Sequence, residues 1–139
     1  MHKKILHGLD GSVGSFKALE EALDLAKRYG IELHTISVEE LPQMPETIGE
    51  LIEEKDAANG FFNGVVKKAR EMAAAQGIEL HPHVVTGHEV HVIVEYVKRH
   101  NFDLLVIGFM GHSAVYDRVM GSTCQSLVRL VPCTVLVVK

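Results

Sequence analysis

The chain has 139 residues, of which 47 % are hydrophobic and 23 % are charged, and its formal net charge at neutral pH is −4. A chain of this length and composition forms one domain, residues 1–139, which buries a core without disulfides or structural metals. The acidic balance excludes a general nucleic-acid-binding role, because such proteins concentrate basic side chains on one face.

The first predicted elements are a strand and an amphipathic helix. Residues 4–9 predict a strand, and residues 15–29 predict a helix whose apolar positions recur every three or four residues. Ser12 and Ser15 are alternative caps at the start of this helix, and Gly30 is positioned to end it.

The middle of the chain contains an acidic segment between regular elements. Residues 33–38 predict a second strand. Residues 39–56 carry seven acids against one base, together with two prolines, which indicates a solvated excursion with a short helical turn. A helix is predicted over residues 57–76, a strand over 79–85 and a helix over 90–100.

The last third completes an alternation of strands and helices. Residues 103–107 predict a strand that is apolar after its first residue, residues 122–131 a helix that Pro132 stops, and residues 134–138 a final strand. Helices that alternate with near-continuous apolar strands are typical of a parallel sheet covered on both faces. The expected class is therefore α/β, a Rossmann-like arrangement.

Glycines after the fourth predicted strand form a distinctive motif. Gly108, Gly111 and Gly121, followed by Ser122, have the spacing G-x2-G-x9-G-[S/T], and the first glycine directly follows an apolar run. A tight glycine turn lets backbone N–H groups approach an anion without interference from Cβ atoms. Gly121 and Ser122 also open the last predicted helix, and helix N-termini attract phosphate. The motif therefore predicts binding of a nucleotide or another phosphate.

Asp10 follows the first predicted strand in the sequence Leu9-Asp10-Gly11-Ser12. Ligands of open parallel sheets bind beyond the carboxyl ends of the strands, where Asp10 and Gly108 are both expected. A carboxylate there can accept hydrogen bonds from ribose hydroxyls or reach a metal that phosphates hold. The alternative is a turn aspartate that supports the start of the next helix. The glycine motif favours the ligand-binding role.

Several of these segments resemble the universal stress protein family over nearly the whole chain. The resemblance lies in Leu9-Asp10-Gly11-Ser12, in Ser37-Val38, in the glycine motif and in the closing segment Val131–Val138. The glycine motif is that of the ATP-binding members of the family. The resemblance implies a five-stranded parallel sheet in the order 3-2-1-4-5, with helices on both faces, so that the first and fourth strands are neighbours.

The resemblance also implies roles for individual residues. Asp10 would contact the ribose or the phosphate-bound metal, and Val38 would meet adenine. The ligand would be ATP, with ADP and AMP as alternatives, and any Mg²⁺ would be held mainly by the phosphates. The complete set of expected nucleotide-binding residues is Leu9, Asp10, Val38, Gly108, Met110, Gly111, His112, Gly121, Ser122 and Thr123.

Three functions remain open from the sequence. The first is an adenine-nucleotide-binding regulatory protein of the stress response, which acts by nucleotide-dependent conformational or partner switching. The second is a slow ATP hydrolase or phosphotransferase that uses His112 and Asp10. The third is a structural dimer that binds no nucleotide and keeps its glycines for turn geometry. The chain has neither a P-loop lysine motif nor a G-x-S-x-G nucleophile elbow, so we expect no catalytic residues and at most a weak ATPase.

Partners and location follow from the remaining features. The apolar strand predicted over residues 134–138 is an edge that invites pairing with a second copy, so we expect a homodimer through it. Cys124 and Cys133 form no C-x-x-C motif, which suits a reducing compartment. With no apolar run near the roughly 18 residues of a membrane span and no signal segment at the start, we expect a soluble cytoplasmic protein.

Two side-chain types invite other chemistry. His81, His83, His88 and His91 are close enough in sequence to suggest a zinc or nickel site, but histidines at a strand edge are usually solvated, so no metal site is expected. Cys124 lies in the first turn of the last predicted helix, where the helix dipole would stabilise a thiolate. A small thiol that packs into the core is the favoured interpretation.

Overall fold

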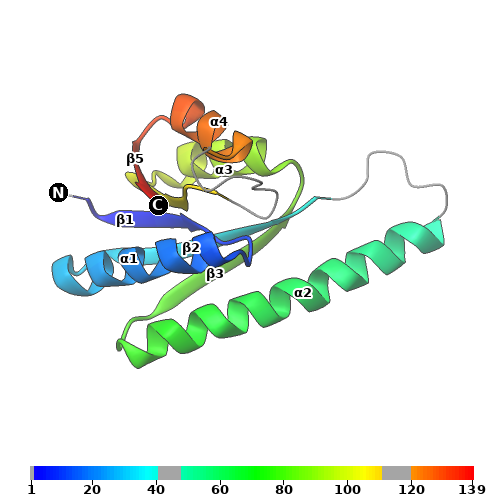
Figure 1. Ribbon diagram of the computed structural model, residues 1–139, viewed down its shortest axis with the longest axis horizontal. Helices are drawn as coiled ribbons and strands as arrows, with labels where there is room; N and C mark the ends of the chain where they lie inside the picture. Colours follow the sequence, from blue (N-terminus) through cyan, green and yellow to red (C-terminus); the bar gives the residue numbers. More distant parts are fainter. Residues whose placement is uncertain (1, 41–47, 111–119) are drawn as a thin grey trace.

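The fold is a five-stranded parallel sheet flanked by four helices (Figure 1). The computed structural model describes residues 2–40, 48–110 and 120–139, with backbone alone for residues 48–59. The strand order is β3-β2-β1-β4-β5, which confirms the predicted class and topology. In chain order the elements are β1 (Lys4–Gly8), α1 (Val13–Tyr29), β2 (Glu32–Glu39), α2 (Ile48–Ala75), β3 (Leu80–Thr86), α3 (Glu89–His100), β4 (Leu104–Gly108), α4 (Ser122–Leu130) and β5 (Thr134–Val138).

The sheet separates two apolar cores. On one face, side chains such as Leu19 and Leu23 of α1 and Ala69 of α2 pack against β1, β2 and β4. On the other face, Ile93 of α3 and Leu127 of α4 pack against the same strands. Figure 1 shows α1 and α2 on one side of the sheet and α3 and α4 on the other. The central strands are buried on both faces, which is why they are apolar at consecutive positions.

The first helix ends at Tyr29 as predicted but begins at Val13, two residues before the predicted start, because Ser12 and not Ser15 is its cap. Ser12 is the N-cap of α1, and its Oγ accepts a hydrogen bond from the Ser15 N–H at 3.1 Å. Gly30 ends the helix in the left-handed region with φ 64°, and its N–H donates to the Ala26 carbonyl. These two caps determine where the chain leaves β1 and where it enters β2.

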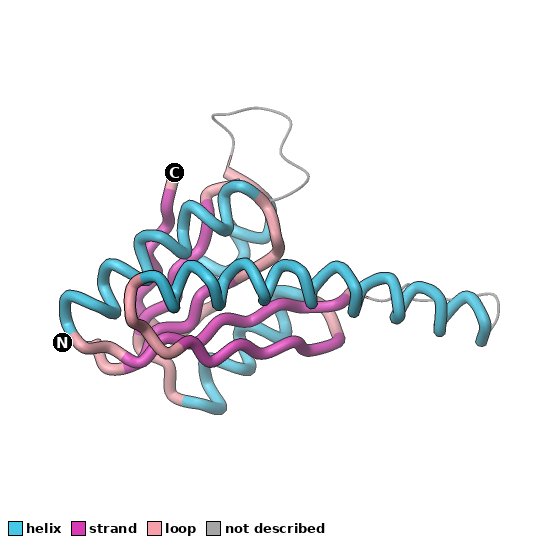
Figure 2. Tube along the Cα trace, turned by 90° about the horizontal axis from the view of Figure 1, so that it is seen from below, coloured by secondary structure: helices cyan, strands magenta, loops and turns pink. Residues whose placement is uncertain are grey.

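The second helix is longer than predicted. It spans Ile48–Ala75, 28 residues or about 42 Å, whereas the sequence analysis placed residues 48–56 in a solvated excursion. Glutamate is a good helix former, and acidic residues near a helix N-terminus interact favourably with the dipole, so an acidic run is compatible with a helix start. Figure 2 shows that this end of α2 extends past the ends of the strands.

Glu39 is the second correction to the acidic segment. It was assigned to the excursion but is the last residue of β2, where its backbone pairs in register with Thr86 of β3. Its side chain is only 3 % exposed. Among the described residues, no helix combines the length and the apolar character needed to cross a membrane.

Candidate functional site

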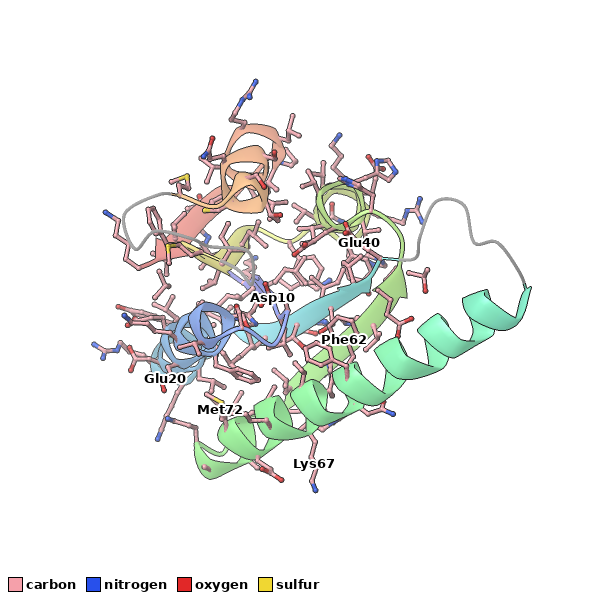
Figure 3. The ribbon with its side chains drawn as sticks, turned by 45° about the vertical axis from the view of Figure 1, so that its right-hand side comes forward. Asp10, Glu20, Glu40, Phe62, Lys67 and Met72 are labelled. Atoms are coloured by element: carbon pink, nitrogen blue, oxygen red, sulfur yellow. The ribbon has the colours of Figure 1, made fainter. Side chains whose placement is uncertain are left out.

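A cavity of about 690 Å³ lies at the carboxyl end of the sheet, where β1 and β4 are neighbours. Chain direction switches between these two strands, and this is the place where open parallel sheets bind ligands. Figure 3 shows Asp10, Glu40 and Phe62, which come from three different segments, around this end of the sheet. Its walls include Asp10, Ser12, Val38, Glu39, Phe62, Gly108, Met110, Gly121, Ser122 and Thr123.

The turn after β1 holds Asp10 in a defined position. Its Oδ1 accepts hydrogen bonds from the N–H of Ser12, at 2.9 Å, and from the Ser12 hydroxyl. Because Ser12 in turn caps α1, the carboxylate of Asp10 belongs to the turn that starts this helix. Asp10 also lines the cavity, so its place in this turn is compatible with the ligand-binding role that the sequence predicts.

Beneath this turn lies a histidine that the sequence analysis did not consider. His7 of β1 is fully buried, and its Nε2–H donates to the Ser15 carbonyl at 2.8 Å. Burial lowers the pKa of His7 to about 4, so the imidazole is neutral at neutral pH. The hydrogen bond ties the first turn of α1 to the centre of the sheet. A polar residue inside the otherwise non-polar run of residues 5–9 was the sequence signal for it.

Gly108 is required by packing between β4 and α1. A Cβ at this position would lie 2.9 Å from the carbonyl carbon and oxygen of Gly14. Gly14 is similarly confined, because its Cβ would lie 2.6 Å from the Met110 carbonyl oxygen. The sequence analysis assigned Gly108 to anion binding, and the geometry gives it a structural reason as well: it brings the loop after β4 against the first turn of α1.

The start of α4 presents backbone donors to the cavity. Gly121 is the N-cap, with φ −60° and ψ 151°, and its own N–H donates to the Phe109 carbonyl at 3.1 Å. The N–H groups of Ser122 and Thr123, in the first turn, have no acceptor within the helix. Both residues line the cavity, so these donors and two hydroxyls lie at its wall. Cys124 packs into the core, as the sequence favoured, and burial raises the pKa of its thiol.

The opposite wall carries carboxylates. Glu39 is buried, its Oε2 accepts from the Thr86 hydroxyl at 3.5 Å, and its Oε1 has no hydrogen-bond partner among the described residues. Glu40 has a different role, since its Oε1 accepts from the Glu89 N–H at 2.9 Å and so holds the first turn of α3. No lysine or arginine is among the described residues that line the cavity.

Comparison with known proteins decides the family. A family model described as the universal stress protein family matches residues 1–139. The chain belongs to the universal stress protein family. It is 29 % identical to a universal stress protein of Methanocaldococcus jannaschii over 147 aligned residues, which cover 100 % of this chain and 83 % of that protein.

Solved structures give the same fold. The universal stress protein UspA from Lactobacillus plantarum matches with a TM-score of 0.90 and 26 % identity over 99 % of this chain and 98 % of that one. Another solved universal stress protein, described in complex with cAMP, matches with a TM-score of 0.76 and 25 % identity over 99 % and 97 % of the two chains.

The residues expected to form the site in this universal stress protein fall into three groups. Those that the structure brings to the cavity are Asp10, Val38, Gly108, Met110, Gly121, Ser122 and Thr123. Leu9 lies apart from them in the core, 1 % exposed, with its N–H bonded to the Ile36 carbonyl. Gly111 and His112 lie outside the described residues.

Part of the cavity wall comes from residues that the sequence did not indicate. Phe61 and Phe62 of α2, Ile93 of α3 and Glu39 of β2 all line it. Their signals were ambiguous, because apolar residues in a predicted helix indicate packing as well as a ligand wall. Glu39 was grouped with the acidic residues that follow it and was therefore interpreted as part of a solvated segment.

The histidines of the universal stress protein do not gather as the sequence suggested. His88 is the exposed N-cap of α3, and His91 is exposed on that helix. His81 and His83 instead lie beside His34 of β2, with 4.6 Å between the ring centroids of His34 and His81. Burial lowers the pKa of both His34 and His83.

Proposed function

We propose that this protein binds an adenine nucleotide in the cavity at the carboxyl end of the sheet, with the phosphates at the start of α4 and the base toward Val38 and Glu39. The observation that carries the proposal is the meeting of two features at one cavity, the open N-terminus of α4 and the Asp10 turn. Family membership and the relative described in complex with cAMP support it. Of the nucleotides, ATP is the one favoured by the glycine motif, and ADP and AMP fit the same elements.

The phosphates would be held by dipoles and hydroxyls. The N–H groups of Ser122 and Thr123 donate to phosphate oxygens, and the macrodipole of α4 favours the negative charge. The described wall of the cavity has no basic side chain, so a triphosphate needs a cation, and Mg²⁺ held mainly by the phosphates supplies it. Gly111 and His112 remain proposed phosphate contacts.

The sugar and the base would use the other strand ends. Asp10 accepts hydrogen bonds from ribose hydroxyls while it remains part of its turn. Val38 offers an apolar contact to the ring. The Glu39 carboxylate, whose Oε1 is buried and without a hydrogen-bond partner among the described residues, would turn toward the cavity to accept the exocyclic amino group of adenine. Guanine carries a carbonyl oxygen at the corresponding position, which a carboxylate repels, so adenine is the preferred base.

The role that fits this chemistry is regulation. The nucleotide biases a conformation or a partner interaction in the stress response, and homodimerisation through β5 accompanies it. Hydrolysis is disfavoured because the sequence contains neither a P-loop lysine motif nor a G-x-S-x-G nucleophile elbow. The close packing at Gly108 supports a second candidate, a structural dimer that binds no nucleotide, because the packing explains one glycine of the motif without any ligand. Measuring nucleotide binding distinguishes this candidate from the nucleotide-binding regulator.

The test is calorimetric titration of the purified protein with ATP, ADP and AMP, each with and without Mg²⁺. Gly121→Val adds bulk where the phosphates would lie, and the φ of −60° at this position is accessible to any residue, so the local backbone conformation is compatible with valine. Binding should be lost in this variant while cooperative thermal unfolding is kept, with a midpoint a few degrees lower because valine is a poorer N-cap than glycine. Gly64→Val on the exposed surface of α2 is the matched control, because nothing lies near its Cβ. No heat with any of the nucleotides in the unaltered protein would refute the proposal.

A further inference from the structure

Four residues with metal-ligating side chains share one face of the sheet, away from the cavity. Glu32 and His34 lie two apart in β2, and His81 and His83 lie two apart in β3, so each pair points to the same side of its strand. The register places His34 directly opposite His81. Since β2 runs on from His34 to the cavity residue Val38, about 13 Å separates this cluster from the proposed nucleotide site.

We propose that Glu32, His34 and His81 form a binding site for a divalent transition-metal ion such as Zn²⁺, with His83 as the residue that orients His34. One ligand atom from each of the first three residues lies within 4.8 Å of those of the other two. Two ligands of a tetrahedral zinc ion lie about 3.4 Å apart, so an ion fits after small side-chain rotations, chiefly of His81. Two imidazoles and one carboxylate are a donor set that zinc and its neighbours prefer.

The hydrogen bonds around His34 prepare it for this role. Its Nε2 lies 2.8 Å from the Glu32 Oε1, and its Nδ1 lies 2.9 Å from the His83 Nε2. A carboxylate can only accept, so in the metal-free protein His34 Nε2–H donates to Glu32, and His34 Nδ1 accepts from His83 Nε2–H. Both ring nitrogens of His34 therefore have a defined hydrogen-bond partner, Glu32 for Nε2 and His83 for Nδ1.

Metal binding would replace one proton by the ion and keep the rest of this arrangement. The ion takes the place of the proton between His34 Nε2 and Glu32. The proton on His34 Nε2 leaves to solvent, and the proton on His83 Nε2 passes along the hydrogen bond to His34 Nδ1. His83 Nδ1 takes up a proton from solvent, so His34 Nδ1–H now donates to His83 Nε2. Both imidazoles stay neutral and the number of protons is unchanged. A hydrogen bond from the second nitrogen of a ligating histidine is the usual support of such sites.

The surroundings allow an ion to enter and keep a coordination position open. The side chain of Glu32 is 51 % exposed and that of His34 is 12 % exposed, so the site opens to solvent on the carboxylate side. Lys4 is the cation whose charge acts on both Glu32 and His34. Its Nζ is held elsewhere, by the His100 carbonyl at 2.8 Å and over the Phe102 ring. Three protein ligands leave a fourth position for water.

The experiment uses protein without a purification tag, treated with a chelator and then dialysed. Zn²⁺ is titrated by calorimetry and Co²⁺ by visible absorption, and one equivalent per chain is expected. His34→Gln and His81→Gln should each abolish binding, and His83→Gln should weaken it about 10- to 100-fold. The double variant His88→Gln, His91→Gln is the control, since both side chains are exposed and lie outside the cluster, and it should bind as the unaltered protein does.

Three results would overturn the proposal. The first is no binding of either ion to the unaltered protein. The second is binding that persists in both His34→Gln and His81→Gln. The third is an intense sulfur-to-cobalt charge-transfer band, which would assign the ion to a cysteine. Thermal unfolding of each variant checks folding, and His81→Gln keeps the test valid if the better-buried His34 does not tolerate substitution. Nucleotide binding should be unaffected by His81→Gln, so this proposal and the proposed function fail independently.

Discussion

Replacing Gly108 by alanine measures how closely the loop after β4 approaches α1. The added Cβ would lie 2.9 Å from two backbone atoms of Gly14 and 3.4 Å from the Ser15 nitrogen. Backbone in the first turn of a capped helix cannot rotate away as a side-chain tip can, so either the helix or the loop must shift. Overpacking of this kind costs about 1–3 kcal/mol. The loss of unfolded-state freedom on replacing glycine offsets about 0.4–1 kcal/mol of that.

The net expected loss is therefore about 1.5 kcal/mol in the free energy of unfolding. Unfolding entropies near 2.1 cal/mol/K per residue give about 0.3 kcal/mol/K for this chain, so the midpoint should fall by about 5 °C. Differential scanning calorimetry measures it directly. Gly64→Ala is the matched control, because its Cβ meets nothing and alanine favours a helix, so its midpoint should rise or stay unchanged. A midpoint for Gly108→Ala equal to that of the unaltered protein would refute the packing argument.

Three further predictions concern other parts of the site. Because burial lowers the pKa of His7 from about 6.5 to about 4, the unfolded chain binds the proton more tightly, and the contribution of His7 to stability is complete above about pH 6.5 and declines as the pH falls toward 4. The free energy of unfolding should fall by up to about 1.4 kcal/mol per pH unit on this account. In urea unfolding measured at several pH values, the free energy of unfolding of His7→Gln should therefore depend less steeply on pH than that of the unaltered protein. Equal pH dependences would contradict the prediction. Ser12→Ala removes the cap of α1 and should lower the free energy of unfolding by about 1 kcal/mol, measured in the same way, whereas no change would mean that the cap is replaced by water. Glu39→Gln should reduce the preference for AMP over GMP about tenfold in competitive titrations, because an amide can donate to guanine as well as accept from adenine; an unchanged ratio would remove Glu39 from base recognition.

The sequence predicts the elements well where their burial is regular. Strands such as residues 104–108 are buried on both faces, so their apolar runs are unambiguous. Strand order is a different matter, because local patterns say nothing about which strands are neighbours, and the order 3-2-1-4-5 came from the family resemblance alone. Residues 48–56 were misjudged since solvated loops and the exposed starts of long helices have the same acidic composition.

The same distinction between local and long-range signals applies to the residues of the site. Asp10 and the start of α4 were predictable, because a turn residue and a glycine before a helix have local signatures. Glu39 and His34 were not predictable, because their partners lie far along the chain. Glu39 contacts Thr86 of the neighbouring strand. His34 contacts His81 and His83 of that strand. Contacts of this kind depend on which distant strands are neighbours and on how they are aligned, and local sequence patterns do not reveal either.

The described wall of the cavity carries no lysine or arginine, and this has a consequence for how a ligand responds to ionic strength. Attraction between full charges in a protein and on a ligand weakens as ionic strength rises, within a screening length of about 8–10 Å. Hydrogen bonds from main-chain N–H groups act at contact distance and are screened far less. An occupant held mainly by such groups would lose less affinity as ionic strength rises than one held by lysine or arginine side chains.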